Sequence, residues 1–389
     1  MVVGFARPFT AGLPGGHRNE RAHHRNPTPI RHNQLMLEAL AVALGVLLIA
    51  IALLDAFETI FLPRRVTRQL RLARLFFRST WRPWAALAPR MPSASREAYL
   101  SFYGPLSLIF LIILWAGLLI AGFGLINWGL GSAVTASGAN AGFGSDMYMS
   151  GTTFFTLGLG DVSPHSSFSR VIAVVEAGAG LGFLALVITY LPVLYQAFSR
   201  RELNVSLLDA RAGSPPSAGE FFRRLNASGG VENLNAFLQE WERWAAELLE
   251  IHLSYPVLAL YRSQHERQSW LASLTFILDV SSLVIAGGME GSQRAARLTF
   301  AMARHAAVDL SQVLAATPDP NVDRLPAGDF ERLVAAGGDL LAGAHLEKLT
   351  ELRRSYEPNV AALSRSVLMP LPSWLPAEGH DAWQSSPWE

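Results

Sequence analysis

The 389-residue chain contains no cysteine, so disulfides, thiolate chemistry and cysteine-ligated metal sites are excluded. Charge is also scarce, because only 16% of the residues are Asp, Glu, Lys or Arg, and Lys348 is the single lysine. Half of the residues are hydrophobic. This composition is low in charge for a soluble protein and favours membrane spans. The use of arginine in place of lysine is typical of a GC-rich bacterial genome.

The N-terminal segment carries Arg, His and Pro without an apolar core, so residues 1–34 are not a secretory signal peptide. Met36 directly precedes the first apolar run. We therefore expect residues 1–35 to be disordered and Met36 to be the natural start of translation.

Three apolar runs are long enough to span a membrane, since roughly 20 residues cross a hydrocarbon core of about 30 Å. They are Leu37 to Leu62, Leu106 to Ile126 and Val171 to Phe198. A shorter apolar stretch, Met147 to Thr156, lies between the last two runs. It is too short to span and has the length of a re-entrant helix, which must be buried in protein.

Arginine placement sets the predicted orientation. Nine arginines lie between residues 64 and 96, and Arg200 and Arg201 follow the third run. The positive-inside rule puts both segments in the cytoplasm of a bacterial cell, with the chain in its inner (plasma) membrane. The loop that holds the short apolar stretch, and the N-terminus, are then extracytoplasmic.

The C-terminal half reads as an all-α cytoplasmic domain, because its apolar residues recur at three- and four-residue spacing. No strand–helix alternation and no GxGxxG motif is present, so a dinucleotide-binding fold is not expected. The apolar run Trp270 to Ala286 is interrupted by Asp279, Ser281 and Ser282. That favours a buried helix over a fourth span.

The predicted fold class is an all-α integral membrane protein with three transmembrane helices, a re-entrant pore helix and filter loop, and an all-α cytoplasmic domain. The Pro-rich tail is expected to be disordered. The expected segments are a disordered N-terminus (1–35), the first transmembrane helix (36–63), a basic interfacial linker helix (64–98), a pore module (99–200), the cytoplasmic domain (201–368) and the tail (369–389).

The most informative segment is residues 152–161, TTFFTLGLGD, between the last two spans. Gly158 and Gly160 permit positive φ, so successive peptide planes can turn the same way. Carbonyl oxygens of this strip could then replace the water around a cation. The oxygens come from Thr156, whose hydroxyl adds one more, and from Leu157, Gly158, Leu159 and Gly160. One chain supplies one strip, so a pore needs rotational symmetry, most simply four copies.

Residues 100–200 resemble the pore module of the potassium channel family, whose pattern is TTxxTVGYGD followed by xxP. The matching residues are Thr152, Thr153, Thr156, Gly158, Gly160, Asp161 and Pro164. The inner end of the first span, LDAFETIFLPRR, also resembles a bacterial branch of such channels. The resemblance implies a homotetramer, not an enzyme, that conducts K⁺ passively, with Thr152, Thr153 and Asp161 supporting the filter. It implies no cofactor and no metal beyond the permeant K⁺.

The strip departs from the family pattern at two positions, where Leu157 replaces the usual Val and Leu159 the usual Tyr. Tyr148 and Met149 stand where the family often has two Trp, one of which donates to that Tyr. Donor and acceptor are absent together, so we expect a filter without that outer hydrogen bond. A weakly selective monovalent cation channel is therefore an alternative. A non-conducting membrane receptor or scaffold is another.

The third span holds the gating candidates Gly178, Gly180, Gly182 and Pro192. Glycines and proline can bend a helix, but small residues also let membrane helices pack closely. Both interpretations stay open. Glu176, a further gating candidate, is an ionisable residue inside an apolar run. It lies either behind the filter or in a pair with Arg170.

The linker is predicted to be an interfacial helix that binds anionic membrane lipids. Arg65, Arg68, Arg71 and Arg74 recur at every third residue, but a voltage sensor would need three shielding helices before it. Asp55 and Glu58 at the end of the first span are expected to form a cap or a salt bridge. The acidic C-terminal domain offers no nucleic-acid patch, and the sequence does not identify a cytoplasmic regulator.

Overall fold

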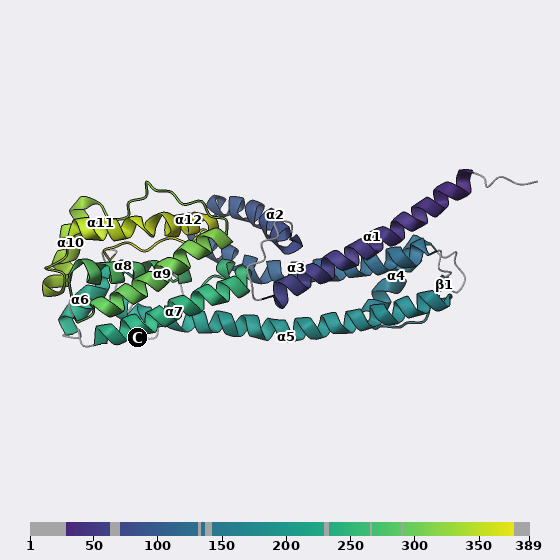
Figure 1. Cartoon of the computed structure of the whole chain (residues 1–389), viewed down its shortest axis with the longest axis horizontal. Helices are drawn as coiled ribbons and strands as arrows, with labels where there is room; N and C mark the ends of the chain where they lie inside the picture. The colour runs from purple at the N-terminus through teal and green to yellow at the C-terminus, as the bar shows by residue number, and fades with distance from the viewer. Residues whose placement is uncertain are drawn as a thin grey trace, which may run out of the picture.

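The computed structural model describes residues 29–62, 71–130, 134–136, 142–228, 233–264, 267–289 and 291–376. Most of these residues are helical, and one short strand pair is present among them. Figure 1 shows an elongated molecule, with three long helices toward one end and a cluster of shorter helices at the other. The elements are α1 (Pro29–Ile60), α2 (Leu72–Leu87), η1 (Ala88–Arg90), α3 (Ser93–Gly129), β1 (Val134–Ala136), α4 (Phe143–Phe154), β2 (Val162–Pro164), α5 (Ser167–Ala212), α6 (Ala218–Ser228), α7 (Leu234–Ser254), η3 (Pro256–Leu260), α8 (Trp270–Ala286), α9 (Gln293–Val313), α10 (Ala327–Gly337), η4 (Gly338–Leu340), α11 (Leu346–Arg354) and α12 (Glu357–Val367).

Helices α1, α3 and α5 are long and apolar enough to cross a membrane, which confirms an all-α membrane protein with three candidate spans. Helix α1 packs along α3 through glycines. A Cβ on Gly45 would lie 2.5 Å from the Gly122 carbonyl oxygen, and one on Gly129 would lie 2.5 Å from the Glu38 carbonyl oxygen. The two backbones therefore approach as closely as small residues allow.

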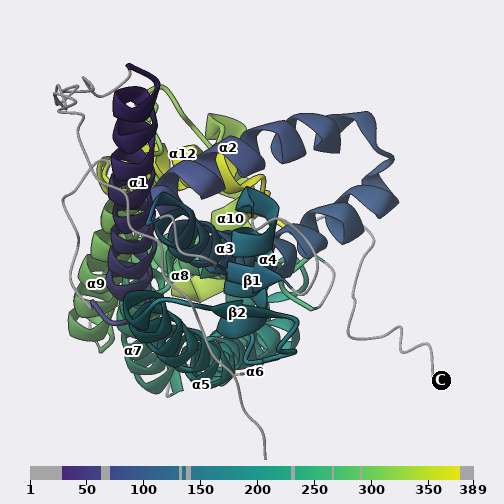
Figure 2. The ribbon, with the colours of Figure 1, turned by 90° about the vertical axis from the view of Figure 1, so that its right-hand side faces the viewer.

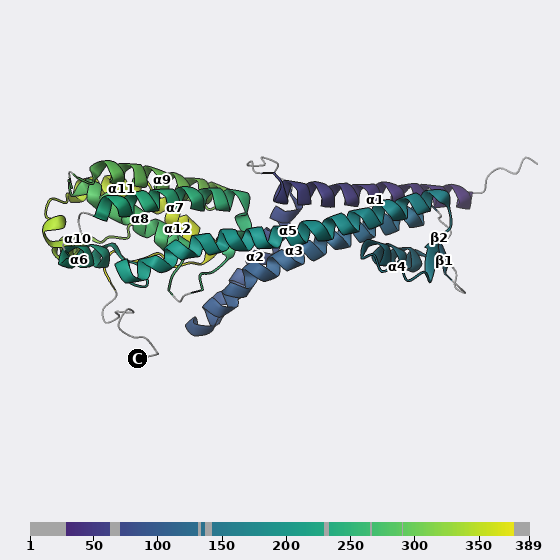
Figure 3. The same ribbon diagram turned by 90° about the horizontal axis from the view of Figure 1, so that it is seen from below.

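The segment before α3 differs from the expected single linker helix. The structure has a separate helix α2, a short 3₁₀ turn η1 and then the first turns of α3. Pro89 and Pro92 separate them, because proline cannot donate to a preceding helical turn. Figure 3 shows this region leaning away from the long axis of the spans. Residues 63–70, with Arg64, Arg65 and Arg68, lie outside the described part.

Two expected boundaries are wrong. Helix α1 begins at Pro29, upstream of Met36, so residues 29–35 are helical rather than disordered; residues 1–28 lie outside the description. Helix α5 contains Pro192 without ending there, and it continues past Phe198 to Ala212. Its last turns enter the C-terminal domain, where Val205 and Leu208 are buried. The boundary expected between residues 200 and 201 therefore falls inside a helix.

Helix α8 lies at the centre of the C-terminal domain, and all its side chains except Ile285 are buried. Its one carboxylate, Asp279, accepts two hydrogen bonds from Arg324, at 3.0 and 2.8 Å, and one from the Tyr356 hydroxyl at 2.6 Å. A buried charge is tolerated when it is paired in this way. The prediction of a buried helix, rather than a fourth span, is confirmed.

The start of the expected disordered tail is instead packed on this domain. Met369 and Trp374 are buried. The Gly219 backbone N–H donates to the Trp374 carbonyl at 2.8 Å, and Arg324 donates to the Pro372 carbonyl at 2.7 Å. The Trp374 ring also lies under the Arg324 guanidinium, 5.7 Å from its centroid. Residues 369–376 are thus ordered by contacts distant in sequence, and residues 377–389 lie outside the description.

Candidate pore and filter

The short helix α4 lies between α3 and α5 and ends where the glycine strip begins. Gly124 of α3 faces Met147 of α4 so closely that a Cβ there would lie 2.2 Å from the methionine methyl. Ser150 donates to the Ile120 carbonyl of α3 at 2.7 Å. Helix α4 is therefore held against α3 on one side, as a re-entrant helix requires. Figure 2 shows the ladder of β1 and β2 near the same end of the molecule.

Residues 156–160, to which the word strip refers from here on, have an alternating backbone conformation. Thr156, Gly158 and Gly160 have φ values of +55°, +55° and +78°. Positive φ is costly for a residue with a side chain, and Thr156 adopts it at the first position of the strip. The side chains of Leu157 and Leu159 between these positions are exposed in the single chain. Positive φ, which the sequence analysis said that glycine permits at positions 158 and 160, is found at both.

Two threonines before the strip hold its first peptides through their backbone carbonyls. The Leu157 N–H donates to the Thr152 carbonyl at 2.7 Å, and the Thr156 N–H donates to the Thr153 carbonyl at 3.0 Å. The Thr152 hydroxyl turns back to the Met149 carbonyl. These contacts place both threonines next to the strip, and their supporting role stays a prediction.

Sequence reasoning missed a contact on the outer side of the strip. The Tyr148 side chain of α4 lies close to the Asp161 carboxylate. Leu159 has no polar side chain, so the expected loss of a donor–acceptor pair at that position stands. Tyr148 instead brings α4 close to the carboxylate at the end of the strip. The signal that could have found it is a phenol 13 residues before a carboxylate, across a turn that reverses the chain.

Glu176 of α5 is fully buried and faces α4, where one oxygen of its carboxyl group contacts the Ser150 hydroxyl oxygen. Its second oxygen has no hydrogen-bond partner among the described residues. The alternative pairing with Arg170 is not found, because the Arg170 side chain reaches the Pro164 carbonyl. Glu176 therefore lies behind the re-entrant helix and links it to α5.

The three glycines of α5 are not equivalent. A Cβ on Gly180 would lie 1.9 Å from the Phe154 carbonyl oxygen at the end of α4, whereas a Cβ on Gly178 or Gly182 would meet nothing within 4 Å. Gly180 is thus a close-packing position. Gly178 and Gly182 leave open space in the single chain.

Asp55 joins three elements near the C-terminal end of α1. It is buried, accepts from the Ala73 backbone N–H with both oxygens, at 3.2 and 3.0 Å, and accepts from Trp115 Nε1 at 2.9 Å. Glu58 lies 3.5 Å from Arg71. The predicted capping role of Asp55 is confirmed, since it caps the first turn of α2.

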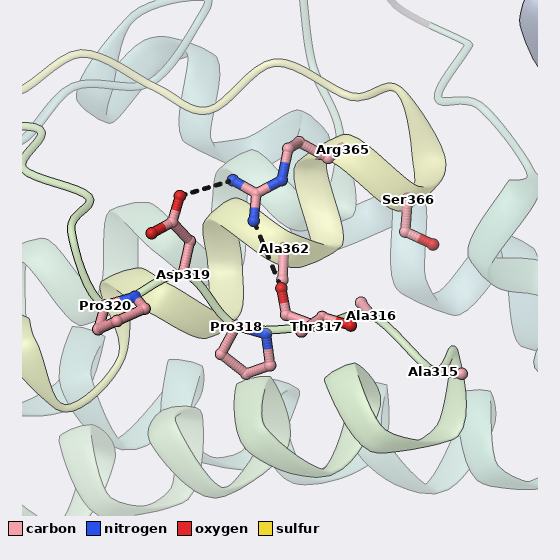
Figure 4. Close-up of a pocket in the computed structure, with 9 residues that line it drawn as sticks. All are labelled: Ala315, Ala316, Thr317, Pro318, Asp319, Pro320, Ala362, Arg365 and Ser366. Atoms are coloured by element: carbon pink, nitrogen blue, oxygen red, sulfur yellow. Dashed lines mark hydrogen bonds and ion pairs between the residues drawn. The ribbon is translucent and has the colours of Figure 1, made fainter.

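A surface pocket of about 530 Å³ lies far from the strip, between the end of α9 and α12 (Figure 4). Its one guanidinium, Arg365, lies 3.9 Å from Asp319 and donates to the Thr317 carbonyl at 3.4 Å. The other walls are mostly Ala and Pro. Polar groups that already contact one another in an open pocket do not indicate a particular ligand.

Comparison with known proteins supports the pore assignment. Residues 108–196, which comprise most of α3, all of α4, the strip and most of α5, match the family described as "Ion channel". Residues 108–196 are thus similar to an ion-channel domain, and this similarity supports an ion channel in a membrane protein.

The chain is also similar to a protein described as "Uncharacterized membrane protein YdjJ", from Bacillus subtilis (strain 168). The two are 26% identical over 263 residues, which cover 65% of this chain and 74% of the relative. No solved structure matches the chain significantly.

Proposed function

We propose that this chain forms a homotetrameric potassium channel in the inner membrane of a bacterium, with its C-terminal domain in the cytoplasm. The observation that carries the proposal is the alternation of positive φ at Thr156, Gly158 and Gly160. Such alternation turns neighbouring carbonyls toward one side of the strip, where they can coordinate a dehydrated cation. The permeant K⁺ would be held by residues 156–160, and no other cofactor is needed.

The surroundings of the strip fit this role. Helix α4 ends at Phe154, so its C-terminal dipole end lies next to the strip and favours a cation there. The exposed side of α5 carries Leu181, Leu184 and Ile188, which is consistent with burial against further copies of the chain. Four strips around one axis would complete the coordination that a single chain leaves open.

A weakly selective cation channel remains the second candidate, favoured by Leu159. In this position a leucine cannot form a hydrogen bond that would fix the outer carbonyls. Tyr148 lies close to Asp161 at the neighbouring end of the strip, and a hydrogen bond between these side chains would compensate there. We therefore expect potassium selectivity to survive, and Tyr148→Phe to weaken it.

Helix α2 is proposed to lie on the membrane surface. Arg74, Arg78 and Arg82 are exposed at four-residue spacing, and Leu75 is exposed beside them. This pattern fits an interfacial helix that binds anionic lipid headgroups.

The deciding experiment is the reversal potential of the purified protein in planar bilayers under opposed K⁺ and Na⁺ gradients. A potential near the potassium equilibrium value supports the proposal, and one near zero with measurable current favours the weakly selective channel. Gly158→Ala should abolish the current, because φ at that position is positive and alanine there costs roughly 1–2 kcal/mol.

The matched control for that variant is Gly117→Ala on α3, where a Cβ meets nothing within 4 Å. It should conduct like the unmodified protein. Absence of current in the unmodified protein, or a Gly158→Ala protein that retains its cellular activity, would favour a non-conducting receptor or scaffold.

A further inference from the structure

A short segment between α7 and α8 touches the spans and the C-terminal domain at once. We name residues Tyr255–Arg262, which include η3, the junction segment. Its Val257 and Leu258 are buried in one apolar cluster with Leu108 of α3 and with Tyr190 and Leu194 of α5. The segment therefore fills the space between the inner ends of α3 and α5.

Arg201 attaches the junction segment to α5. This arginine is 1% exposed and donates to the Leu258 carbonyl at 2.7 Å and to the Tyr261 carbonyl at 3.1 Å. Its charge is balanced by the adjacent Glu202, 2.8 Å away. A buried guanidinium that loses these carbonyls would keep its desolvation cost without compensation, so α5 and the segment are held as one unit.

The contact with α3 is made by an aromatic ring on a glycine. A Cβ on Gly104 would lie 2.6 Å from Cδ2 and 3.1 Å from Cγ of Tyr261. The same ring lies 5.7 Å from the Phe198 ring of α5. Tyr261 is therefore wedged between α3 and α5, and no larger residue fits at position 104 while Tyr261 stays in place.

The far end of the segment is tied to the C-terminal domain. Arg262 donates to the Val367 and Leu368 carbonyls at the end of α12, at 2.7 and 3.0 Å, and lies 3.5 Å from Glu97 of α3. One residue earlier in α12, the Ser366 carbonyl accepts from Trp81 Nε1 of α2 at 2.9 Å. The end of α12 is thus connected to α3 through Arg262 and to α2 through Trp81.

We propose that the junction segment is the element through which the C-terminal domain controls the pore. The inference rests on the proposed channel function. Gly178, Gly182 and Pro192 lie in α5 on the filter side of Arg201, and the turns beyond Arg201 are buried in the C-terminal domain. Motion of that domain reaches α5 directly, and the Tyr261–Gly104 contact decides whether α5 moves relative to α3.

The absence of native cysteine allows a direct test by cross-linking. Because a Cβ on Gly104 lies 3.1 Å from Tyr261 Cγ, the two Cβ atoms are within about 4.6 Å, near the spacing of a disulfide. The double variant Gly104→Cys with Tyr261→Cys is recorded as single channels in planar bilayers, before oxidation, after oxidation and after reduction.

We expect oxidation to slow the transitions between open and closed levels at least tenfold, and reduction to reverse this. The unitary current and the reversal potential should not change, because the filter is untouched. Each single-cysteine variant should be insensitive to oxidant. Unaltered transition rates in the cross-linked protein, with cross-linking verified by peptide mass, would overturn the inference.

A second comparison needs no cross-link. Gly104→Ala pushes on Tyr261, whereas Gly117→Ala on the same helix meets nothing. The first should change the open probability at least threefold at an unaltered reversal potential, and the second should change neither. Equal open probabilities in the two variants would also contradict the inference. Absence of current in the unmodified protein would overturn the proposed function itself, a result distinguishable from conduction with unaltered gating.

Discussion

The contact between Gly180 and Phe154 yields a quantitative prediction about how α5 supports the filter. In Gly180→Ala, the new Cβ would lie 1.9 Å from the Phe154 carbonyl oxygen and 2.8 Å from its carbon. These are backbone atoms at the end of α4, so relief requires one helix to shift by about 1 Å. Overpacking of this kind costs typically 1–3 kcal/mol.

The expected change in stability follows from two opposing terms. Alanine gains about 0.8–1 kcal/mol over glycine inside a helix, so Gly180→Ala should lose up to about 2 kcal/mol net. Gly178→Ala and Gly182→Ala meet nothing within 4 Å and should gain up to about 1 kcal/mol each. Because the propensity gain is common to all three variants, the two classes should differ by the overpacking cost, about 1–3 kcal/mol.

The assay is the unfolding midpoint of the detergent-solubilised full chain, measured for the three variants side by side, with reversal potentials for those that conduct. Gly180→Ala should have the lowest midpoint and, because Phe154 precedes the strip by two residues, an altered selectivity. A Gly180→Ala protein as stable and selective as the unmodified chain would refute the close-packing argument and leave a hinge as the role of this glycine.

Two further predictions concern the buried polar groups. Asp55→Ala should lower the unfolding free energy by about 1–3 kcal/mol, because the Ala73 N–H and the Trp115 indole lose their acceptor. Asp55→Asn should lower it less. Equal unfolding midpoints for Asp55→Ala and the unmodified chain would contradict this reasoning. Burial, and then the charge of the nearby Arg201, lower the pKa of His252 to about 3, so its ring stays neutral in the folded chain while the unfolded chain takes up a proton below about pH 6.5. Stability should therefore fall as the pH drops below about 6.5, by up to about 1.4 kcal/mol per pH unit. His252→Gln should flatten this pH dependence of the unfolding free energy, measured in urea between about pH 7.5 and 5.5. The same dependence on pH in both proteins would contradict the reasoning.

The sequence was most informative where a local pattern decides the structure. Gly158 and Gly160 predicted positive φ because glycine adopts it without a clash. In α8, Asp279 and two serines distinguished a buried helix from a span, since an unpaired carboxylate is costly in lipid. The identity of its partner, Arg324, could not be predicted, because the two residues are 45 positions apart and share no local pattern.

The failures share a physical cause. Met369 and Trp374 were assigned to a disordered tail because proline-rich sequence lacks periodicity, yet both are buried by distant parts of the chain. The end of α5 was placed at the loss of continuous hydrophobicity, but the helix continues because Val205 and Leu208 find an apolar environment in a second domain. Hydropathy indicates whether a segment prefers an apolar or an aqueous environment, but it does not indicate where a helix ends.

Because α5 is one continuous helix, it fixes how the C-terminal domain is rotated about the helix axis relative to the filter. A helix advances about 1.5 Å and turns about 100° with each residue. One residue inserted between Arg201 and Val205 would therefore rotate the domain beyond it about the helix axis and separate Arg201 from its carbonyl acceptors. An insertion of seven residues would restore the angle to within about 20° while displacing the domain along the axis. Chimaeras that join this pore to another domain should therefore keep the rotational phase of α5 across the junction.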